Sequence, residues 1–255
     1  MPTPLKERYR TKSGKVLKEL FPAKSVVETY LLYSGGIELS LAQSDRMVIA
    51  HTNKFPVYEF WWTAAQAPDR IAKMAEEIFP MLEDEMFDTL QEKWHIYSDP
   101  VYRSALFYIL NRCSSTAAAS HGVIDRAGLN PVALSQMKRL DTTNLYIVLD
   151  KHHDLEDNIN TEIKSDYKLF PVGEFSYNLL DRNMSHAADL PYVNHLKLLA
   201  KLKKSDYKWA VLYKNHEGLF NKNNPIFNSR IIMMDKYGRK TNKLLACEEV
   251  IFANF

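Results

Sequence analysis

The turn Ser34-Gly35-Gly36 is the first part of the chain whose residue types could do chemistry. Glycines between a strand and a helix let the backbone approach a nucleotide-like cofactor, because no Cβ stands in the way. The preceding segment, Val26 to Tyr33, is rich in β-branched and aromatic residues and almost free of charge, which predicts a buried parallel strand. A glycine pair after a strand is also common in plain turns, so both interpretations stay open here.

The segments on either side of this turn predict a βαβ unit, the usual beginning of a doubly wound sheet. Ser13 to Phe21 has apolar residues at helical spacing and ends before Pro22, and Ile37 to Ala42 begins a second helix. Met47 to Ala50 is a short apolar strand. The chain therefore opens with helix, strand, glycine turn, helix and strand.

Helical spacing dominates the middle of the chain, and strand patterns return after it. The helical part runs from Val57 to about Leu110, and a loop rich in small residues follows from Asn111 to Pro131. The later elements are strands at Leu145–Leu149, Trp209–Tyr213, Arg230–Met234 and Glu249–Phe252 and an amphipathic helix at Asp189–Leu202. We expect residues 1–56 and 141–255 to form the two parts of one α/β core, and residues 57–140 to form a helical insert.

Several segments, taken in order along the chain, share the pattern of one protein family. They are Tyr9 and Lys12 before the helix Lys15–Pro22, Val27-Glu28-Thr29-Tyr30 before Ser34-Gly35-Gly36, His51-Thr52 after a strand, Val57–Trp61, Ala105–Arg112, Glu174-Phe175-Ser176-Tyr177 and Glu249–Asn254. In this order they resemble the Dam-type (D12 class) DNA adenine N6-methyltransferases over nearly the whole chain. The resemblance implies an α/β fold with a methyltransferase-like (Rossmann-like) mixed sheet, in which the mostly helical insert is a target-recognition-like region.

The resemblance also implies which residues would hold S-adenosyl-L-methionine (SAM) and the target base. The cofactor-binding positions are Tyr9, Lys12, Glu28, Ser34, Gly35, Gly36 and Thr52. In the family's catalytic tetrapeptide, an acid and a proline carbonyl accept the amine hydrogens of a flipped-out adenine, and an aromatic ring stacks on the base. Glu174 and Tyr177 stand at the catalytic positions of the acid and the ring.

The signature loops depart from the family pattern. His51-Thr52 stands where the family has Asn-Asp. A threonine lacks the paired carboxylate acceptors that hold ribose hydroxyls, a loss of about 1.5–3 kcal/mol in cofactor binding. Phe175-Ser176 replaces two rigid prolines, and bulky residues from Leu31 to Tyr33 lengthen the glycine loop. These changes predict impaired catalysis.

Two basic stretches are candidates for contact with DNA phosphates. The first holds Lys201, Lys203, Lys204 and Lys208, and the second holds Lys236, Arg239, Lys240 and Lys243. Such charge runs are usually solvated faces, and phosphate contact requires both stretches to lie on the same side of the fold. The candidate nucleic-acid-binding residues are Lys201, Lys203, Lys204 and Lys240.

The composition fits a folded soluble protein: 255 residues, 46% hydrophobic, 25% charged, with a net charge of +2. Cys113 and Cys247 match no zinc or redox spacing, and His51, His152 and His153 lack a third ligand, so we expect no metal. No signal-peptide core precedes the fold, and no apolar run reaches the roughly 20 residues that span a bilayer. We expect no membrane partner and a cytoplasmic location, or one within a particle assembled inside the cell.

Three functions stay open. The first is a catalytically impaired DNA adenine methyltransferase-like protein without a cofactor, which binds double-stranded DNA or joins a protein complex through its insert. The second is a divergent, active SAM-dependent DNA adenine N6-methyltransferase, and the third is a SAM-dependent enzyme for RNA or a modified nucleotide. The insert offers apolar surface to a protein partner through Trp61, Trp62, Met74, Met81, Met86 and Trp94. The altered loops favour the first function.

Overall fold

A computed structural model describes residues 3–152, 155–159, 164–173, 189, 193–220, 224–226 and 228–255. Its strands form one sheet in the order β3-β2-β1-β4-β5-β8-β6-β7. They are β1 (Val26–Thr29), β2 (Met47–Thr52), β3 (Leu145–Leu149), β4 (Tyr167–Gly173), β5 (Trp209–Lys214), β6 (Arg230–Met234), β7 (Lys240–Thr241) and β8 (Glu249–Ala253). From β3 to β5 all neighbours are parallel, and β8 lies antiparallel between β5 and β6. This is a Rossmann-like mixed sheet, so the predicted methyltransferase-like α/β fold class is confirmed.

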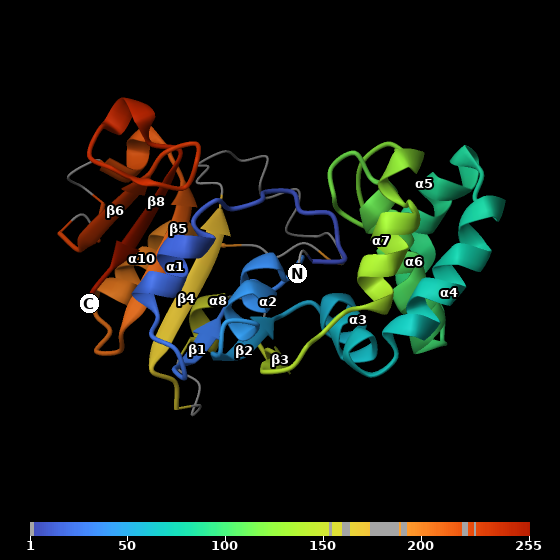
Figure 1. Ribbon diagram of the computed structural model, residues 1–255, viewed down its shortest axis with the longest axis horizontal. Coiled ribbons are helices and arrows are strands. Elements are labelled where there is room, and N and C mark those ends of the chain that lie inside the picture. Colours follow the sequence, from blue (N-terminus) through green and yellow to red (C-terminus); the bar gives the residue numbers. More distant parts are fainter. Residues whose placement is uncertain are drawn as a thin grey trace.

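Helices cover both faces of the sheet (Figure 1). On one face, α1 (Gly14–Leu20), α2 (Gly36–Ala42) and α3 (Phe55–Gln66) pack against alternate strand residues such as Val27 and Leu169. On the other face, α8 (Leu155–Asn158) and α10 (His195–Lys203) cover the intervening residues, among them Phe170 and Val211. The alternation follows from the two-residue period of a strand. Within the described ranges, no helix is both long and apolar enough to span a bilayer.

The segment between β2 and β3 is helical and gathers beside the sheet (Figure 1). After α3 it contains α4 (Pro68–Ile78), α5 (Asp84–Lys93), α6 (Pro100–Cys113) and α7 (Pro131–Lys138). Asp99 caps α6 by accepting from the Tyr102 amide at 2.7 Å, with Pro100 at the first helical position. Phe60 and Phe107 belong to the same hydrophobic cluster as Val27 of the sheet, so this helical lobe shares a core with the sheet.

Three elements differ from the sequence prediction. β1 ends at Thr29 instead of Tyr33, because Leu31 has a positive φ of 67° that ends the extended backbone. The helix expected from Asp189 begins at His195, where the side chain of Asn194 caps it by accepting from the Lys197 amide at 3.1 Å. β4 was not predicted at all. It contains a buried Lys168, and its last residues include Pro171 and Gly173; lysine, proline and glycine are all rare in a central strand.

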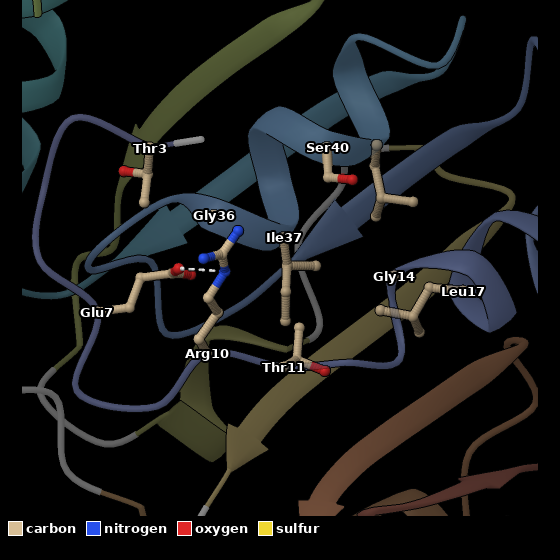
Figure 2. Close-up of a pocket in the computed structure, with 10 residues that line it drawn as sticks. Thr3, Glu7, Arg10, Thr11, Gly14, Leu17, Gly36, Ile37 and Ser40 are labelled. Atoms are coloured by element: carbon tan, nitrogen blue, oxygen red, sulfur yellow. Dashed lines mark ion pairs between the residues drawn. The ribbon is translucent and has the colours of Figure 1, made fainter. Parts of the chain in front are cut away.

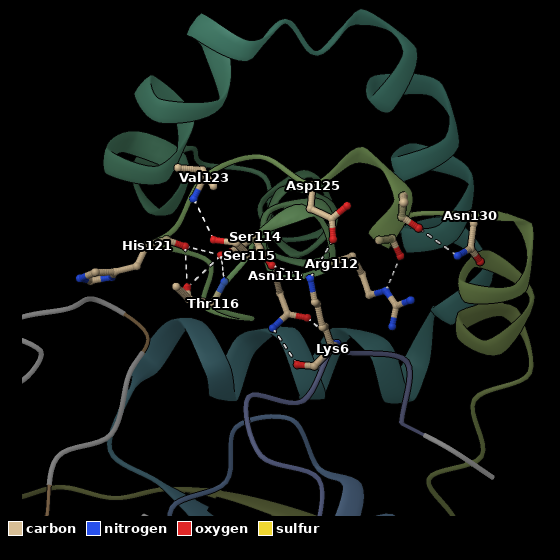
Figure 3. A network of polar contacts seen from close by, with 12 residues as sticks. Lys6, Asn111, Arg112, Ser114, Ser115, Thr116, His121, Val123, Asp125 and Asn130 are labelled. Atoms are coloured by element: carbon tan, nitrogen blue, oxygen red, sulfur yellow. Dashed lines mark hydrogen bonds and ion pairs between the residues drawn. The ribbon is translucent and has the colours of Figure 1, made fainter. Parts of the chain in front are cut away.

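Residues 3–13, here called the N-terminal strap, cross the carboxyl edge of the sheet. At one end, the Lys6 amide donates to Asn111 Oδ1 of the helical lobe at 2.7 Å (Figure 3). At the other end, the buried carboxylate of Glu249 on β8 accepts from Thr11 Oγ1 and the Lys12 amide, each at 2.8 Å, and from the Ser13 hydroxyl. The strap therefore joins the helical lobe to the far part of the sheet.

The substitution Glu249→Ala tests how firmly the strap is held. It leaves three donors without their acceptor, so we expect a loss of about 2–4 kcal/mol in the free energy of unfolding, measured by urea denaturation. Trypsin should also cleave at Arg8 or Arg10 faster than in the unmodified protein. Glu249→Gln keeps one acceptor oxygen and should show a smaller effect. Equal stability of all three proteins would show that Glu249 does not hold the strap.

Candidate functional site

The candidate site lies at the carboxyl ends of β1, β2 and β4. Along the sheet, the chain proceeds from β1 to β2 and β3 on one side and continues with β4 and β5 on the other. In open α/β sheets, ligands bind outside the carboxyl ends of the strands where the order reverses in this way. The glycine turn follows β1, and the N-terminal strap passes over the same edge.

The glycine turn contacts side chains of the protein itself. Gly35 has a φ of 71°, and a Cβ built on it would overlap the ring of Trp61. Trp61 is fully buried and its Nε1 donates to the Tyr33 carbonyl at 2.8 Å, which fixes the ring in place. A Cβ on Gly36 would overlap the carboxylate of Glu7 from the strap. The space that a glycine-rich turn normally leaves for a cofactor is therefore filled by an indole and a carboxylate.

Two side chains of the protein itself, Glu7 and Trp61, stand against this turn. The carboxylate of Glu7 is the end of a flexible side chain and could move, but the Trp61 ring could leave only by breaking its contact with the Phe60 ring and its own hydrogen bond. The sequence placed Gly35 and Gly36 correctly at a strand-to-helix turn. Their glycine character is explained here by the close approach of Trp61 and Glu7, which are the residues that the sequence interpretation missed.

The Glu28 side chain lies on the face of the sheet opposite to the one covered by α2 and α3, and it is fully buried there. Its carboxylate lies 2.7 Å from Lys168 Nζ and 3.0 Å from His51 Nε2, and it accepts from Ser165 Oγ at 2.8 Å. A buried carboxylate with three such partners is already satisfied. Glu28 therefore acts as the anchor of a buried ion cluster made of the chain's own residues.

His51 extends this buried cluster to the end of β3. Its Nδ1 lies 2.8 Å from Asp150 Oδ1, and its ring stacks on Tyr30 with centroids 4.6 Å apart. Burial by itself lowers the pKa of His51, but the hydrogen bonds from Asp150 and Glu28 and their charges raise it above the usual value. The imidazole is held between two carboxylates, so it is stabilised as the cation.

Thr52 and Ser34 make contacts within the chain. Thr52 is buried at the end of β2, where its Oγ1 accepts from the Lys54 amide at 3.2 Å. The Ser34 carbonyl accepts from the hydroxyl of Thr3 in the strap. Neither position supplies the carboxylate that would hold a ribose.

Tyr9 and Lys12 are held by the strap at different places. The Tyr9 ring packs on Gly173 at the carboxyl end of β4, and an added Cβ there would lie 3.2 Å from the ring. Tyr9 therefore lies at the carboxyl end of β4, beside the point where the strand order reverses. The side chain of Lys12 is exposed, and its carbonyl packs on Gly238 of the β6–β7 hairpin, away from the glycine turn. The predicted catalytic residues Glu174 and Tyr177 lie outside the described residues.

A cavity of about 380 Å³ lies beside the glycine turn, between the strap, α1 and α2 (Figure 2). Glu7 and Arg10 line it and form an ion pair with an O–N distance of 3.7 Å. Burial raises the pKa of Glu7, while Arg10 lowers it. On the buried side of α2, burial raises the pKa of Glu38 to about 7 despite its own backbone N–H, and the charge of Glu7 adds to the increase.

Asp189 forms a second polar cluster that the sequence did not indicate. It is fully buried and accepts from Tyr33 OH at 2.7 Å, from the Ala119 amide at 2.8 Å and from the Ser120 hydroxyl. Burial, and then the Asp189 carboxylate, raise the pKa of Tyr33 well above the usual value, so the phenol stays a donor. The cluster ties the glycine turn to the loop after α6.

The two basic stretches lie near opposite ends of the strands, one near the amino end of β5 and one near its carboxyl end, so they do not form one phosphate-binding surface. The first stretch lies at the end of α10, which leads into the amino end of β5. It contains Lys203 and Lys204, with Lys201 one turn before them. Lys240 of β7 pairs with Met234 of β6, beside the carboxyl end of β5. The amino and carboxyl ends of β5 are about 17 Å apart along the strand. Lys240 Nζ also lies 2.8 Å from Glu19 Oε2, which offsets its charge.

Comparison with known proteins adds little at the level of residues. No family model matches the chain, and no curated protein matches its sequence. A TehB-like SAM-dependent methyltransferase from Corynebacterium glutamicum is structurally similar, with a TM-score of 0.41 and 8% identity over 96% of this chain and 87% of that one. Among the described residues, no three His, Cys, Asp or Glu side chains are grouped to hold a metal ion. The chemistry of the site has to follow from its own residues.

The substitution Glu38→Gln tests the buried carboxyl group through pH. The pKa of Glu38 is raised from 4.5 to about 7 in the folded protein, so stability is complete below pH 4.5 and is lost as the pH rises through 7. Glutamine cannot ionise, so we expect this variant to gain about 1–3 kcal/mol over the unmodified protein between pH 5 and pH 8. The measurement is urea unfolding across this range, with the exposed Glu92→Gln as the control. A constant difference across the range would show that Glu38 does not titrate there.

Proposed function

We propose that this chain is a Dam-type methyltransferase-like protein in which methylation of DNA adenine has been lost, and that it acts as a DNA-binding or protein-complex subunit. The observation that carries the proposal is the glycine turn, where buried Trp61 and the strap residue Glu7 occupy the space above Gly35 and Gly36. A fold keeps its shape when its site residues change, but its function does not follow automatically.

The neighbouring carboxylates support the same conclusion. Glu28 is held by Lys168 and His51, and Thr52 replaces the acid that would bind ribose hydroxyls. Freeing Glu28 for a ligand would leave the ammonium of Lys168 buried without its carboxylate, which is strongly destabilising. The loss of cofactor binding is therefore built into the packing of the core as well as into the loops.

The cavity beside Gly36 favours a second candidate, a divergent SAM-dependent DNA adenine N6-methyltransferase. Its volume of about 380 Å³ suits a small ligand, and its walls carry both a carboxylate and a guanidinium, Glu7 and Arg10. In that case SAM would lie against the strap instead of over Gly35. In this candidate Glu174 and Tyr177 would supply the acid and the stacking ring of the family's tetrapeptide.

A protein partner would meet a smaller apolar surface on the helical lobe than the sequence suggests. Trp61 and Trp94 are buried and Met74 packs against the core, because all three lie on the inner faces of their helices. The large apolar side chains that stay exposed include Trp62, Met81 and Met86, which are 49%, 66% and 47% accessible. These three residues lie on different elements, α3, the turn after α4, and α5, and apolar side chains scattered in this way are common on protein surfaces.

Calorimetry with SAM separates the two candidates. We expect binding weaker than millimolar for the unmodified protein, because Trp61 blocks the turn, and no improvement for Glu7→Ala, because removing the flexible carboxylate leaves the indole in place. An active Dam-type enzyme serves as the positive control. Micromolar binding by either protein would overturn the proposal and support the enzyme.

Electrophoretic mobility shifts on duplex DNA test the proposed DNA contact. If α10 supplies the phosphate contacts, the double variant Lys203→Glu/Lys204→Glu should bind at least about tenfold more weakly at low salt and show a shallower salt dependence. Lys240→Glu is the matched control, since Lys240 lies near the other end of the strands and already pairs with Glu19. Equal binding by all three proteins would exclude α10 as the DNA contact.

A further inference from the structure

The two edges of the sheet are built differently. β7 is only two residues long and carries Lys240, which are two of the devices that keep a sheet edge from pairing with another chain. β3, at the other edge, has the sequence Leu-Tyr-Ile-Val-Leu, with no charge, no proline and no bulge. In the described part of the chain, no strand pairs with the outer side of β3. An apolar edge strand of this kind is a template for strand addition.

The hydrogen-bonding pattern shows which backbone groups face outward. The Val48 amide donates to the Asn144 carbonyl at 2.8 Å, and the Asp150 amide donates to the Thr52 carbonyl at 2.8 Å. With the register of Val48 opposite Leu145, Tyr146 and Val148 bond to β2. By the alternation of a strand, the N–H and C=O groups of Ile147 and Leu149 then point away from the sheet.

The strand is complementary to a second copy of itself. An antiparallel pair centred on Ile147 places Leu145 opposite Leu149 and Tyr146 opposite Val148, and it forms about four hydrogen bonds between the copies. Tyr146 is 56% exposed in the single chain, and facing Val148 it would form an aromatic to β-branched cross-strand pair.

The helix beside this edge carries exposed aromatic side chains as well. α3 contacts β3, and its Phe55 and Trp62 are 52% and 49% exposed. These two residues are seven apart, so they lie on one side of the helix. A twofold axis perpendicular to the sheet at Ile147 keeps α3 of both copies on the same face, next to the seam between the two sheets. The aromatic side chains then add apolar area to an interface that five strand residues alone would leave small.

We propose that the chain forms a homodimer in which the β3 strands of two copies pair antiparallel about Ile147 and join the two sheets into one. The occupant of this edge is thus a second copy of the chain, and the pairing does not depend on whether SAM binds. This interface at β3 is separate from the contacts proposed for α10 and for the helical lobe.

Sedimentation equilibrium over a concentration series tests this dimer with three single substitutions. Tyr146→Asp places a charge in the cross-strand pair. Ile147→Pro removes an outward N–H and no bond to β2, so the fold should tolerate it. Tyr237→Asp is the matched control, because Tyr237 is also exposed, at 67%, but lies on the β6–β7 hairpin. Circular dichroism and a melting curve verify that each variant is folded.

We expect the unmodified chain and Tyr237→Asp to dimerise in the micromolar range, and Tyr146→Asp and Ile147→Pro to associate at least about tenfold more weakly. Hydrogen exchange should show the Ile147 and Leu149 amides protected only at concentrations where the dimer forms. A chain that stays monomeric at hundreds of micromolar overturns the proposal. So does a dimer that is unaffected by Tyr146→Asp, which would place the interface elsewhere. Because SAM calorimetry is independent of this measurement, either proposal can fail while the other stands.

Discussion

The ion pair between Glu28 and Lys168 is the interaction on which the central sheet depends. Glu28 lies on β1 and Lys168 on β4, the two strands that meet where the order reverses, and their charged atoms are 2.7 Å apart. His51 on β2 and Asp150 after β3 extend the cluster across four strands. The two carboxylates face the ammonium of Lys168 and the imidazole of His51, whose pKa they raise, so the carboxylates are compensated within the core. Removing one member would leave the others buried without compensation, which costs about 3–5 kcal/mol.

The glycine turn shows how one local geometry can serve two purposes. A turn with a positive φ and no Cβ lets a cofactor approach the backbone, and it equally lets a tryptophan do so. In this chain the second use is the one present, because α3 sets the Trp61 ring against Gly35 and the indole bonds to the Tyr33 carbonyl. The sequence shows only the glycine pair, which is the same for both uses. What distinguishes them is a residue 26 positions away, whose side chain direction depends on how α3 packs.

Local signals were enough to predict much of the fold. Helical spacing predicted the helices from Val57 to about Leu110, and runs of apolar residues predicted the strands at Leu145–Leu149, Trp209–Tyr213, Arg230–Met234 and Glu249–Phe252, as the structure shows. β4 was missed because Lys168 and Pro171 oppose a central strand by type. Lys168 is tolerated there only because Glu28, 140 residues earlier, neutralises it. Such a pairing cannot be read from either segment alone, and the same holds for Asp189 and its partners.

The buried carboxylates at the carboxyl edge follow a common rule that bears on what this surface can do. Glu249 and Asp189 each accept from three donors of the chain itself, and Glu28 accepts from Ser165 and lies within ion-pair distance of Lys168 and His51. A carboxylate saturated in this way gains little from a ligand and would have to give up existing bonds to receive one. A cofactor site needs acceptors that are held in place but have no partner before the ligand arrives, because such acceptors make binding favourable. The carboxyl edge is therefore stable without a ligand. The groups that still gain by meeting a partner are the exposed ones: the apolar edge of β3, the aromatic side of α3 and the lysines of α10.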